Sequence, residues 1–262
     1  MKLFSTCADP RCPEPLMRVT WVGQSTHPTC QQTAEEIKLR EFVDAAQRGD
    51  EEAANELERQ LNAPKAPPSM GSAALWYAKV AKWPVFPLFS PEQAERLARR
   101  RGVPVNKVAK LPALPSAHPD GDPIKGVCKG ECGKLGHGLY DATTDERQVR
   151  EWWNADPNYG IGVATGHAFD VIDIDGKTGY RSIMELGDDV FPPIHGKVHT
   201  TREDCGEHWY IPATGDGNRA NVKPGLDYRG RGGYVCVPPT TIDGRRYSWV
   251  VQPSPEIYGK AS

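Results

Sequence analysis

The stretch Phe169-Asp170-Val171-Ile172-Asp173-Ile174-Asp175-Gly176 is an apolar run that ends in carboxylates and a glycine. Side chains alternate between the two faces of a β-strand, so residues two apart share a face. A strand here would place Asp173 and Asp175 on one face, with Ile172 and Ile174 in the core behind them. Adjacent carboxylates repel each other unless a cation lies between them, and hard divalent ions such as Mg²⁺ prefer oxygen ligands. The stretch therefore predicts a divalent metal site or, as the simpler alternative, a strand that ends in a polar turn.

The composition of the chain is that of a globular protein with many turns. Its 262 residues leave room for one ordinary domain and a small one. The apolar fraction is 38%, and 26 glycines and 24 prolines favour short elements over a helical bundle. The formal net charge of −2 provides no global attraction to nucleic acid, so a polyanion would need a local basic patch or metal ions.

Neither a membrane span nor a secretory signal is expected. The sequence has no run of about 18 apolar residues, and the N-terminus reaches Cys7 and Asp9 without a long apolar core. We therefore expect a protein of the reducing cytoplasm. In that compartment the seven cysteines are thiols or metal ligands and not disulfides.

Residues 1–32 carry a Cys/His pattern typical of a small zinc-binding module. Cys7 and Cys12 form one close pair, and His27 and Cys30 form a second pair after residues 13–26. Two close pairs on tight turns suit one tetrahedral Zn²⁺ ion, and metal binding would supply the folding free energy that so few apolar residues cannot. The alternative is a disordered tail with incidental thiols.

The remaining sequence predicts an α+β domain preceded by helices. Residues 33–71 have the pattern of a helical segment that ends in a Pro-rich linker, residues 72–252 that of the main domain, and residues 253–262 that of a tail. Ser90-Pro91-Glu92-Gln93 predicts the start of a basic helix. Strands that cluster late in the chain, after several helices, favour a mixed or antiparallel sheet with flanking helices.

Two further segments have residues that could bind metal or phosphate. Asp227 precedes Arg229 and Arg231 and a pair of glycines, so it could complete a metal site while the arginines contact phosphates. A charged hairpin loop is the alternative for that segment. His208 enters a strand soon after Gly206; such a histidine is more often a packing residue, but the preceding Thr201 and Gly206 could receive a phosphate.

Cys128, Cys132 and His137 form the pattern C-x3-C-x4-H. Three candidate ligands within ten residues are typical of a second zinc site. The fourth ligand is missing locally, and Cys205, Cys236 or a water molecule could supply it.

An ordered set of stretches across roughly residues 73–251 resembles the bifunctional DNA primase/polymerase (prim-pol) domain of the archaeo-eukaryotic primase superfamily. The matched stretches are Trp83-Pro84-Val85-Phe86-Pro87-Leu88, residues 138–145 followed by Trp152-Trp153, residues 159–166, Val171-Ile172-Asp173-Ile174-Asp175, His208-Trp209-Tyr210 and residues 225–240. No single piece is decisive, but their order is specific. The resemblance implies the primase-polymerase fold.

The resemblance also implies roles for individual residues. The family's metal-binding carboxylates fall on Asp173, Asp175 and Asp227, which would hold Mg²⁺ or Mn²⁺, and its phosphate-contacting histidine falls on His208. Glu207 departs from the family pattern, and we expect its negative charge to lie near the triphosphate. Family members often carry a Cys/His cluster at the position of the C-x3-C-x4-H pattern, whereas the N-terminal Cys/His pattern lies outside the matched region.

The expected activity is template-directed nucleotidyl transfer from dNTPs or NTPs, for primer synthesis or extension in plasmid, phage or bacterial DNA replication. One metal ion would lower the pKa of the attacking 3′-hydroxyl and the other would offset charge on the leaving pyrophosphate. His208, Arg229 and Arg231 would hold the triphosphate. A metal-dependent nuclease and a non-catalytic, zinc-dependent DNA-binding replication protein are the alternatives.

The expected partners are a single-stranded DNA template, its primer and a helicase. The template needs basic contacts, and five side chains are candidates: Arg99, Arg100, Arg101, Arg219 and Lys223. Family members often have a fused helicase, and none follows the matched region, so we expect a separate replicative helicase. The location would then be the cytoplasm of the host for a phage or plasmid protein.

Overall fold

The structure is a computed structural model that describes residues 4–6, 15–17, 69–187 and 190–259. The chain divides into two units, Met1–Lys65 with Leu186–Val190 and Ala66–Glu185 with Phe191–Ser262. In the first unit, strands β1 (Phe4–Thr6) and β2 (Pro15–Met17) pair antiparallel. The four predicted zinc ligands of this unit, Cys7, Cys12, His27 and Cys30, lie outside the described residues.

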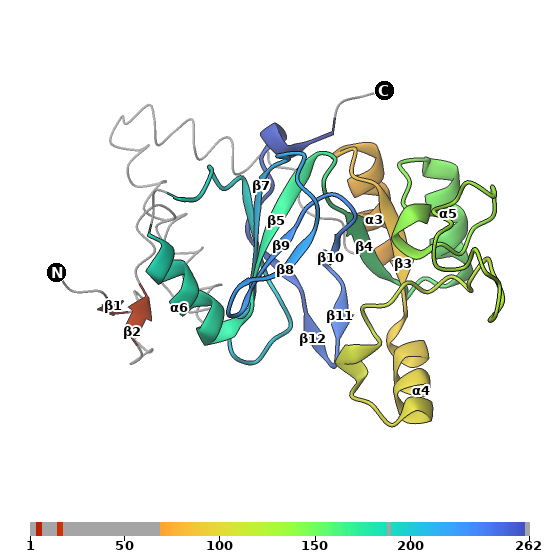
Figure 1. Cartoon of the computed structure of the whole chain (residues 1–262), viewed down its shortest axis with the longest axis horizontal. Coiled ribbons are helices and arrows are strands. Elements are labelled where there is room, and N and C mark those ends of the chain that lie inside the picture. Colours follow the sequence, from red (N-terminus) through yellow and green to blue (C-terminus); the bar gives the residue numbers. More distant parts are fainter. Residues whose placement is uncertain (1–3, 7–14, 18–68, 188–189, 260–262) are drawn as a thin grey trace. The chain divides into compact units, whose positions relative to one another are not determined.

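The second unit is built around a six-stranded antiparallel sheet (Figure 1). Each neighbouring pair of strands runs antiparallel. The strands are, in spatial order, β13 (Ser248–Val251), β6 (Gly196–His199), β7 (Glu207–Pro212), β5 (Phe169–Ile174), β9 (Leu226–Arg229) and β8 (Arg219–Lys223). The predicted carboxylate strand is therefore a central strand.

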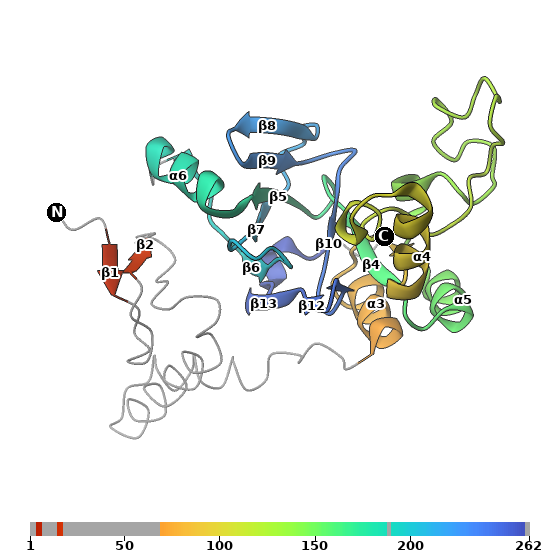
Figure 2. The ribbon, with the colours of Figure 1, turned by 90° about the horizontal axis from the view of Figure 1, so that it is seen from below.

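A smaller antiparallel sheet has the order β10 (Tyr234–Cys236), β4 (Gly160–Ala164) and β3 (Val85–Leu88). Pro87 fits because β3 is an edge strand, where a missing backbone N–H costs no ladder hydrogen bond. Helices α3, α4 and α5 lie on the side of this smaller sheet (Figure 2). Their bounds are α3 Met70–Lys79, α4 Pro91–Arg101 and α5 Glu146–Ala155, and β11 (Thr241–Ile242) pairs with β12 (Arg245–Arg246). The α+β class predicted from the sequence is confirmed.

The hydrophobic core joins the two sheets around Trp83, which is fully buried. Its ring stacks on Tyr77 from α3 at 5.4 Å and on Tyr210 from β7 at 5.7 Å, and it lies 4.4 Å from the ring of Phe169 on β5. Aromatic pairs at these separations bury large apolar areas. Trp83 thereby fixes the position of the six-stranded sheet against α3 and the smaller sheet.

Local sequence signals account for the starts of α4 and α5. Ser90 and Gln93 form the predicted capping box with Pro91 at the first position, and Gly102 ends α4 in the left-handed conformation with φ of 63°. Asp145 caps α5 by accepting from the backbone N–H of Arg147 at 2.8 Å. These helices form where the capping residues predict.

Helix α6 (Gly176–Leu186) follows β5 at once and covers the face of the six-stranded sheet that points away from the smaller sheet (Figures 1 and 2). This helix is not predicted from the sequence, since Gly176 and Gly179 in its first turn are poor helix formers. Gly179 is required there by packing, since a Cβ would lie 2.4 Å from the carbonyl oxygen of Gly225. A residue type that weakens a helix by propensity is therefore retained for a close approach.

The ends of the second unit extend beyond the predicted limits. Helix α3 begins at Met70, within the stretch expected to be a linker. Among the residues expected to be a tail, Ile257 is fully buried and its carbonyl accepts a hydrogen bond from Trp83 Nε1 at 2.8 Å. A short 3₁₀ helix, Pro255–Ile257, thus contributes to the core. None of the described helices has both the length and the apolar character needed to cross a membrane.

Candidate functional site

The strand register brings Asp173, His208 and Asp227 together on one face of the six-stranded sheet. Asp173 on the central strand β5 is directly opposite His208 on β7 and directly opposite Asp227 on β9. Opposed residues in an antiparallel pair have Cβ atoms about 4.5–5.5 Å apart, so their side chains are neighbours. These three residues, distant in sequence, form the candidate active site.

The guanidinium of Arg229 lies between the two opposed carboxylates. Arg229 donates from Nε and Nη2 to Asp173 Oδ2 at 3.2 and 2.9 Å, and from Nη2 to Asp227 Oδ2 at 2.6 Å. The other oxygen of Asp227 accepts from the backbone N–H of Asn221 at 2.7 Å. The positive group between these two carboxylates is therefore a guanidinium, whereas the sequence pattern predicts a divalent metal ion there.

Burial and charge set the protonation states at this site. Burial alone would raise the pKa of Asp173, but the charges of His208 and Arg229 oppose it, and the pKa lies below the usual value. Burial lowers the pKa of His208 to about 4, against the opposing effect of Asp173. His208 is therefore neutral at neutral pH, and the permanent positive charge beside Asp173 is that of Arg229.

Asp175 lies beside the Asp173–Asp227 pair but has a different partner. It follows the end of β5, and its side chain is 47% exposed whereas that of Asp173 is 16% exposed. Its Oδ1 lies 3.2 Å from Nη1 of Arg202, which also donates to Asp204 at 2.9 and 3.1 Å. Burial and the neighbouring Asp173 charge raise the pKa of Asp175.

A pocket of about 210 Å³ opens onto this face and includes Asp173, His208 and Arg229 in its lining. Three predicted nucleotide-binding residues, Thr201, Gly206 and Arg231, are not among the lining residues. For Gly206 the structure gives a packing reason, because a Cβ there would lie 2.3 Å from Thr200 Oγ1. The other nine lining residues were not predicted from the sequence as part of this site: Lys110, Leu139, Asn218, Gly232, Gly233, Tyr234, Val235, Cys236 and Tyr247.

Glu207 does not lie near this pocket, so the expectation of a negative charge beside the triphosphate is wrong. Alternation along β7 directs Glu207 to the opposite face of the sheet, where it is fully buried. Its carboxylate lies 3.7 Å from Lys197 Nζ and 3.5 Å from His199 Nδ1, and it accepts from Trp209 Nε1 at 2.6 Å. Glu207, the residue that departs from the family pattern, is therefore a buried charge that belongs to the interior of the fold.

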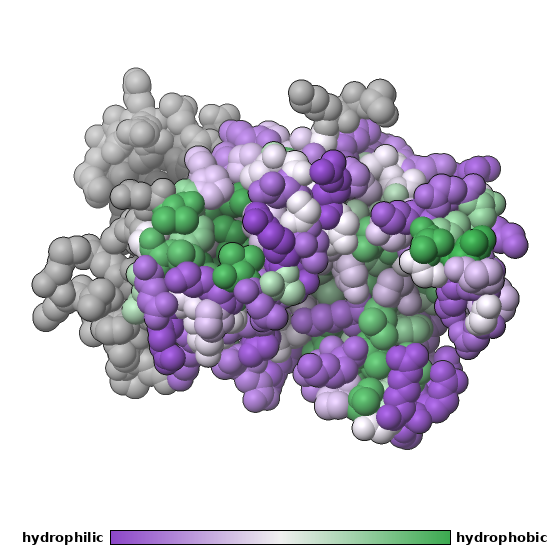
Figure 3. All heavy atoms as spheres, viewed as in Figure 1, coloured by the Kyte–Doolittle hydropathy of each residue, from purple (hydrophilic) through white to green (hydrophobic). Residues whose placement is uncertain are grey.

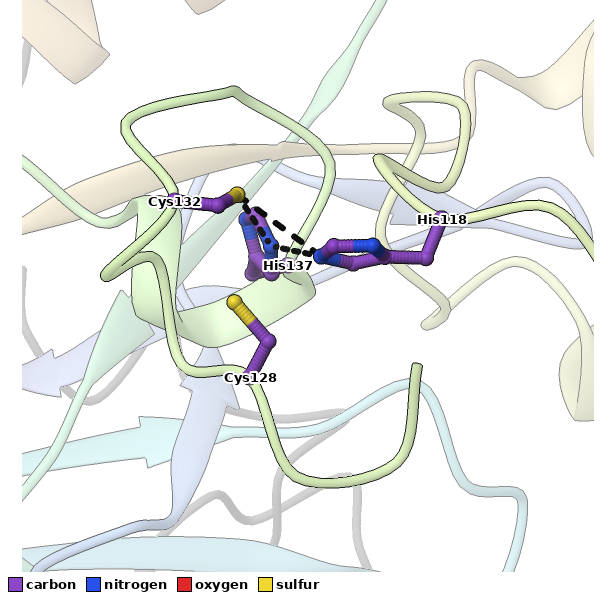
Figure 4. A group of neighbouring side chains, drawn as sticks. All are labelled: His118, Cys128, Cys132 and His137. Carbon is purple, nitrogen blue, oxygen red and sulfur yellow. Dashed lines mark hydrogen bonds between the residues drawn. The ribbon is translucent and has the colours of Figure 1, made fainter. Parts of the chain in front are cut away.

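Four side chains of the loop before α5 form a second candidate site (Figure 4). The ligand atoms of His118, Cys128, Cys132 and His137 all lie within 4.8 Å of one another, and no other such group of three or more occurs in the described residues. The distances are 3.2 Å between the two Nε2 atoms, 3.4 Å from Cys132 Sγ to His137 Nε2 and 3.6 Å from Cys132 Sγ to His118 Nε2. Tetrahedral zinc with ordinary bond lengths requires separations of about 3.3 Å between nitrogens and about 3.6 Å between nitrogen and sulfur.

The fourth member of this cluster is His118, which was not among the fourth ligands considered from the sequence, Cys205, Cys236 or a water molecule. His118 lies ten residues before Cys128, in the turn His118-Pro119-Asp120-Gly121-Asp122. Its Nδ1 is 2.9 Å from Asp122 Oδ2, which leaves Nε2 free to face the cluster. The sequence contains a signal for this cluster, the pattern H-x9-C-x3-C-x4-H with an aspartate four residues after the first histidine.

The loop that carries the cluster has little apolar packing of its own. Ile124, Val127 and Leu135 are 45%, 68% and 49% exposed. Figure 3 shows hydrophobic side chains at the surface on the right-hand side of the view, where this loop lies in Figure 1. Asp141 anchors the end of the loop, because its Oδ2 accepts from the backbone N–H groups of Gly136 and His137 at 3.0 and 2.8 Å. Metal binding would therefore add order that hydrophobic burial does not supply.

The carboxylate site suits a hard divalent ion, whereas the loop cluster suits zinc. Asp173, Asp175 and Asp227 offer only oxygen donors, which Mg²⁺ and Mn²⁺ prefer. In this structure the guanidinium of Arg229 lies between Asp173 and Asp227. The nitrogen and thiolate donors of the loop are the set that structural zinc sites use.

Comparison with known families agrees with this arrangement. Residues 74–258 match the family described as bifunctional DNA primase/polymerase, N-terminal. No curated protein and no solved structure matches the chain significantly. The match covers more than half of the chain and includes the carboxylate site and the Cys/His loop. The chain therefore belongs to the bifunctional DNA primase/polymerase family, a family of primase/polymerase-type nucleotidyltransferases.

Proposed function

We propose that this protein synthesises or extends primers by template-directed nucleotidyl transfer from dNTPs or NTPs during plasmid, phage or bacterial DNA replication. The observation that carries the proposal is the cross-strand pair of Asp173 and Asp227, which holds the Arg229 guanidinium. Asp173, Arg229 and His208 line the same pocket. Carboxylates that hold cations beside a neutral hydrogen-bonding group are suited to a substrate with several phosphates.

Asp173, Asp175 and Asp227 would hold Mg²⁺ or Mn²⁺, which would activate the attacking 3′-hydroxyl and offset charge on the pyrophosphate. The protein residues would bind and orient the nucleotide. His208 is a neutral imidazole whose Nε2 lies on the site side of the ring, 3.5 Å from Asp173 Oδ1, so this nitrogen can donate a hydrogen bond to a phosphate without adding charge. Because Thr201, Gly206 and Arg231 are not lining residues, the phosphate proposal rests on His208 and Arg229.

Basic side chains outside the pocket would contact the template and primer. The stretch from Arg96 to Pro119 contains six lysines and arginines and no acidic residue, although the whole chain has a net charge of −2. Arg99, Arg100 and Arg101 on α4 belong to it and are exposed. Such a local tract attracts the phosphate backbone of DNA. We propose Arg99, Arg100 and Arg101 as template contacts and a separate helicase as the partner that provides single-stranded DNA.

The direct test incubates the full-length protein with a labelled primer–template and Mg²⁺ or Mn²⁺, with and without dNTPs. A polymerase lengthens the primer only when dNTPs are present, and synthesis of new primers on single-stranded DNA shows primase activity. A nuclease would instead shorten the primer in both conditions. Binding of DNA without consumption of dNTPs would support a non-catalytic role, and either of these results would overturn the proposal.

We further propose that the loop cluster binds one structural zinc ion. The donor separations support this proposal. Metal analysis of the full-length protein should find one zinc fewer per chain in Cys132→Ser than in the wild type. Cys205→Ser, outside the cluster, is the control and should retain the wild-type content. Equal zinc in Cys132→Ser and the wild type would contradict the assignment.

A further inference from the structure

Lys110 supplies a positive charge to the pocket that the carboxylate site does not neutralise. It lies in the loop after α4, on the side of the smaller sheet, and lines the same pocket as Asp173, His208 and Arg229. The motifs that identify the active site come from the six-stranded sheet. Lys110 thus reaches the pocket from a part of the fold that those motifs do not include.

The backbone around Lys110 is fixed on two sides. Its carbonyl oxygen accepts a hydrogen bond from Tyr234 Oη on β10 at 2.9 Å. The next carbonyl, that of Leu111, accepts from the backbone N–H of Phe89 at the end of β3 at 3.1 Å. The N–H of Leu111 donates to the carbonyl of Val108 at 3.0 Å. The lysine is therefore held at the pocket by both edge strands of the smaller sheet, not by a loose surface loop.

The other cations near the site already have carboxylate partners. Arg229 contacts both Asp173 and Asp227, and Arg202 contacts Asp175 and Asp204. Lys110, in contrast, has no acidic group within 4.0 Å among residues 69–187 and 190–259. Its charge nevertheless acts on the site, because it adds to burial in lowering the pKa of His208, against the opposing effect of Asp173. Lys110 is thus a cation that faces the site without a fixed counter-charge.

An unpaired cation at this position fits a substrate that carries a triphosphate. When the carboxylates hold metal ions, the phosphates need positive groups that are not engaged with carboxylates. A lysine ammonium serves this role as a point charge with three donors. The pocket volume of about 210 Å³ suits the small reacting end of a nucleotide better than a duplex.

We propose that Lys110 binds the triphosphate of the incoming nucleotide, across the pocket from His208, and so sets the affinity for that substrate. The proposal rests on the proposed nucleotidyl-transfer function. It adds a nucleotide-binding residue from outside the strand motifs that define the carboxylate site.

The test compares Lys110→Ala and Lys110→Arg with the wild type in primer extension and in calorimetric binding of dATP and dAMP. Loss of a charge-assisted hydrogen bond should raise KM and Kd for dATP about 10- to 100-fold. The turnover number should change much less, and the affinity for dAMP should change little because most of the phosphates are absent. Lys110→Arg should restore most of the dATP affinity. These differences between ligands would not follow from a structural role.

Lys79→Ala is the matched control, because Lys79 is exposed on α3, outside the basic stretch, and is not a lining residue. It should leave KM and Kd for dATP unchanged. The inference is overturned if Lys110→Ala binds dATP as the wild type does, if it loses dATP and dAMP affinity equally, or if it loses primer–template affinity instead. A wild-type protein that binds dATP but never extends a primer would overturn the proposed function and leave this inference standing.

Discussion

The two faces of the six-stranded sheet carry similar charged groups in different environments. On the pocket face, the side chains of Asp173, Asp227 and Arg229 are 16%, 20% and 28% exposed. On the face covered by α6, the side chains of Lys197 and Glu207 are 2% and 1% exposed. Both faces pair carboxylates with cations, but only one leaves them within reach of a ligand.

Because side chains alternate along a strand, two adjacent residues can have different roles, one in the active site and the other in the stability of the fold. His208 faces the pocket and Glu207, its neighbour on β7, faces the sealed side. The sealed pair is held further by Trp209, which donates to Glu207 and lies 4.5 Å below the ammonium of Lys197. Substitutions on the pocket face should therefore reduce activity, and substitutions on the sealed face should reduce stability.

The largest effect is expected for Asp227→Asn on the pocket face. Removal of one metal-binding charge should lower the rate of dNTP incorporation about 1,000-fold or more, because metal assistance contributes several kcal/mol. The fold should remain, since an asparagine oxygen can still accept from the backbone N–H of Asn221. Primer extension and thermal unfolding measure the two effects separately.

Asp243→Asn is the matched control for this prediction. Asp243 is exposed in the turn between β11 and β12, where its φ of 52° is a conformation that asparagine also tolerates. This variant should keep wild-type activity. Wild-type extension by Asp227→Asn, with the usual dependence on metal, would contradict the assignment of the site to the pocket face.

A comparable free-energy effect, but on stability, is expected for Glu207→Ala on the sealed face. It leaves the Lys197 ammonium buried without a partner and removes the acceptor of Trp209 Nε1, which should cost about 3–5 kcal/mol. For a domain of this size, that corresponds to a fall in Tm of roughly 10–15 °C. Activity per folded molecule, measured at 20 °C, should stay within about threefold. A stable variant that has lost its activity would refute the separation of the two faces.

Much of the pocket face could be predicted from the sequence. The alternation of apolar and acidic residues in 169–175 predicts a strand, and the ordered motifs predict that Asp173, His208 and Asp227 belong to one site. Strand period and capping residues are local signals, so they can be read without knowledge of the partners. The structure then supplied the register that makes these residues direct neighbours.

What could not be predicted depends on contacts between distant segments. His118 joins the Cys/His cluster from ten residues upstream, and Lys110 reaches the pocket because β3 and β10 hold its loop. Glu207 lies away from the proposed triphosphate site, although it is the neighbour of His208 in sequence, because adjacent residues of a strand face opposite sides of the sheet. Spacing along the chain does not determine such placements, which follow from tertiary packing.

A double-mutant cycle on the sealed face should sharpen the comparison. Lys197→Met or Glu207→Gln alone leaves one buried charge uncompensated, whereas the double variant removes both charges and retains an amide oxygen for Trp209. The double variant should therefore be more stable than the sum of the single effects by about 1–3 kcal/mol. Denaturant unfolding measures the coupling. Strict additivity would show that the two side chains do not act as a pair.

The smallest effect is expected for Arg231→Ala at the border of the pocket face. Arg229 and Arg231 lie two residues apart, but Arg229 lines the pocket and Arg231 is exposed outside it. The Arg231 side chain forms no ion pair with the residues that the structure describes, and an exposed arginine of this kind contributes little, so KM for dNTP should change by about twofold or less. Steady-state primer extension with varied dNTP measures this change. A tenfold rise in KM would show that the nucleotide reaches Arg231, and the functional part of this face would then extend beyond the lining residues.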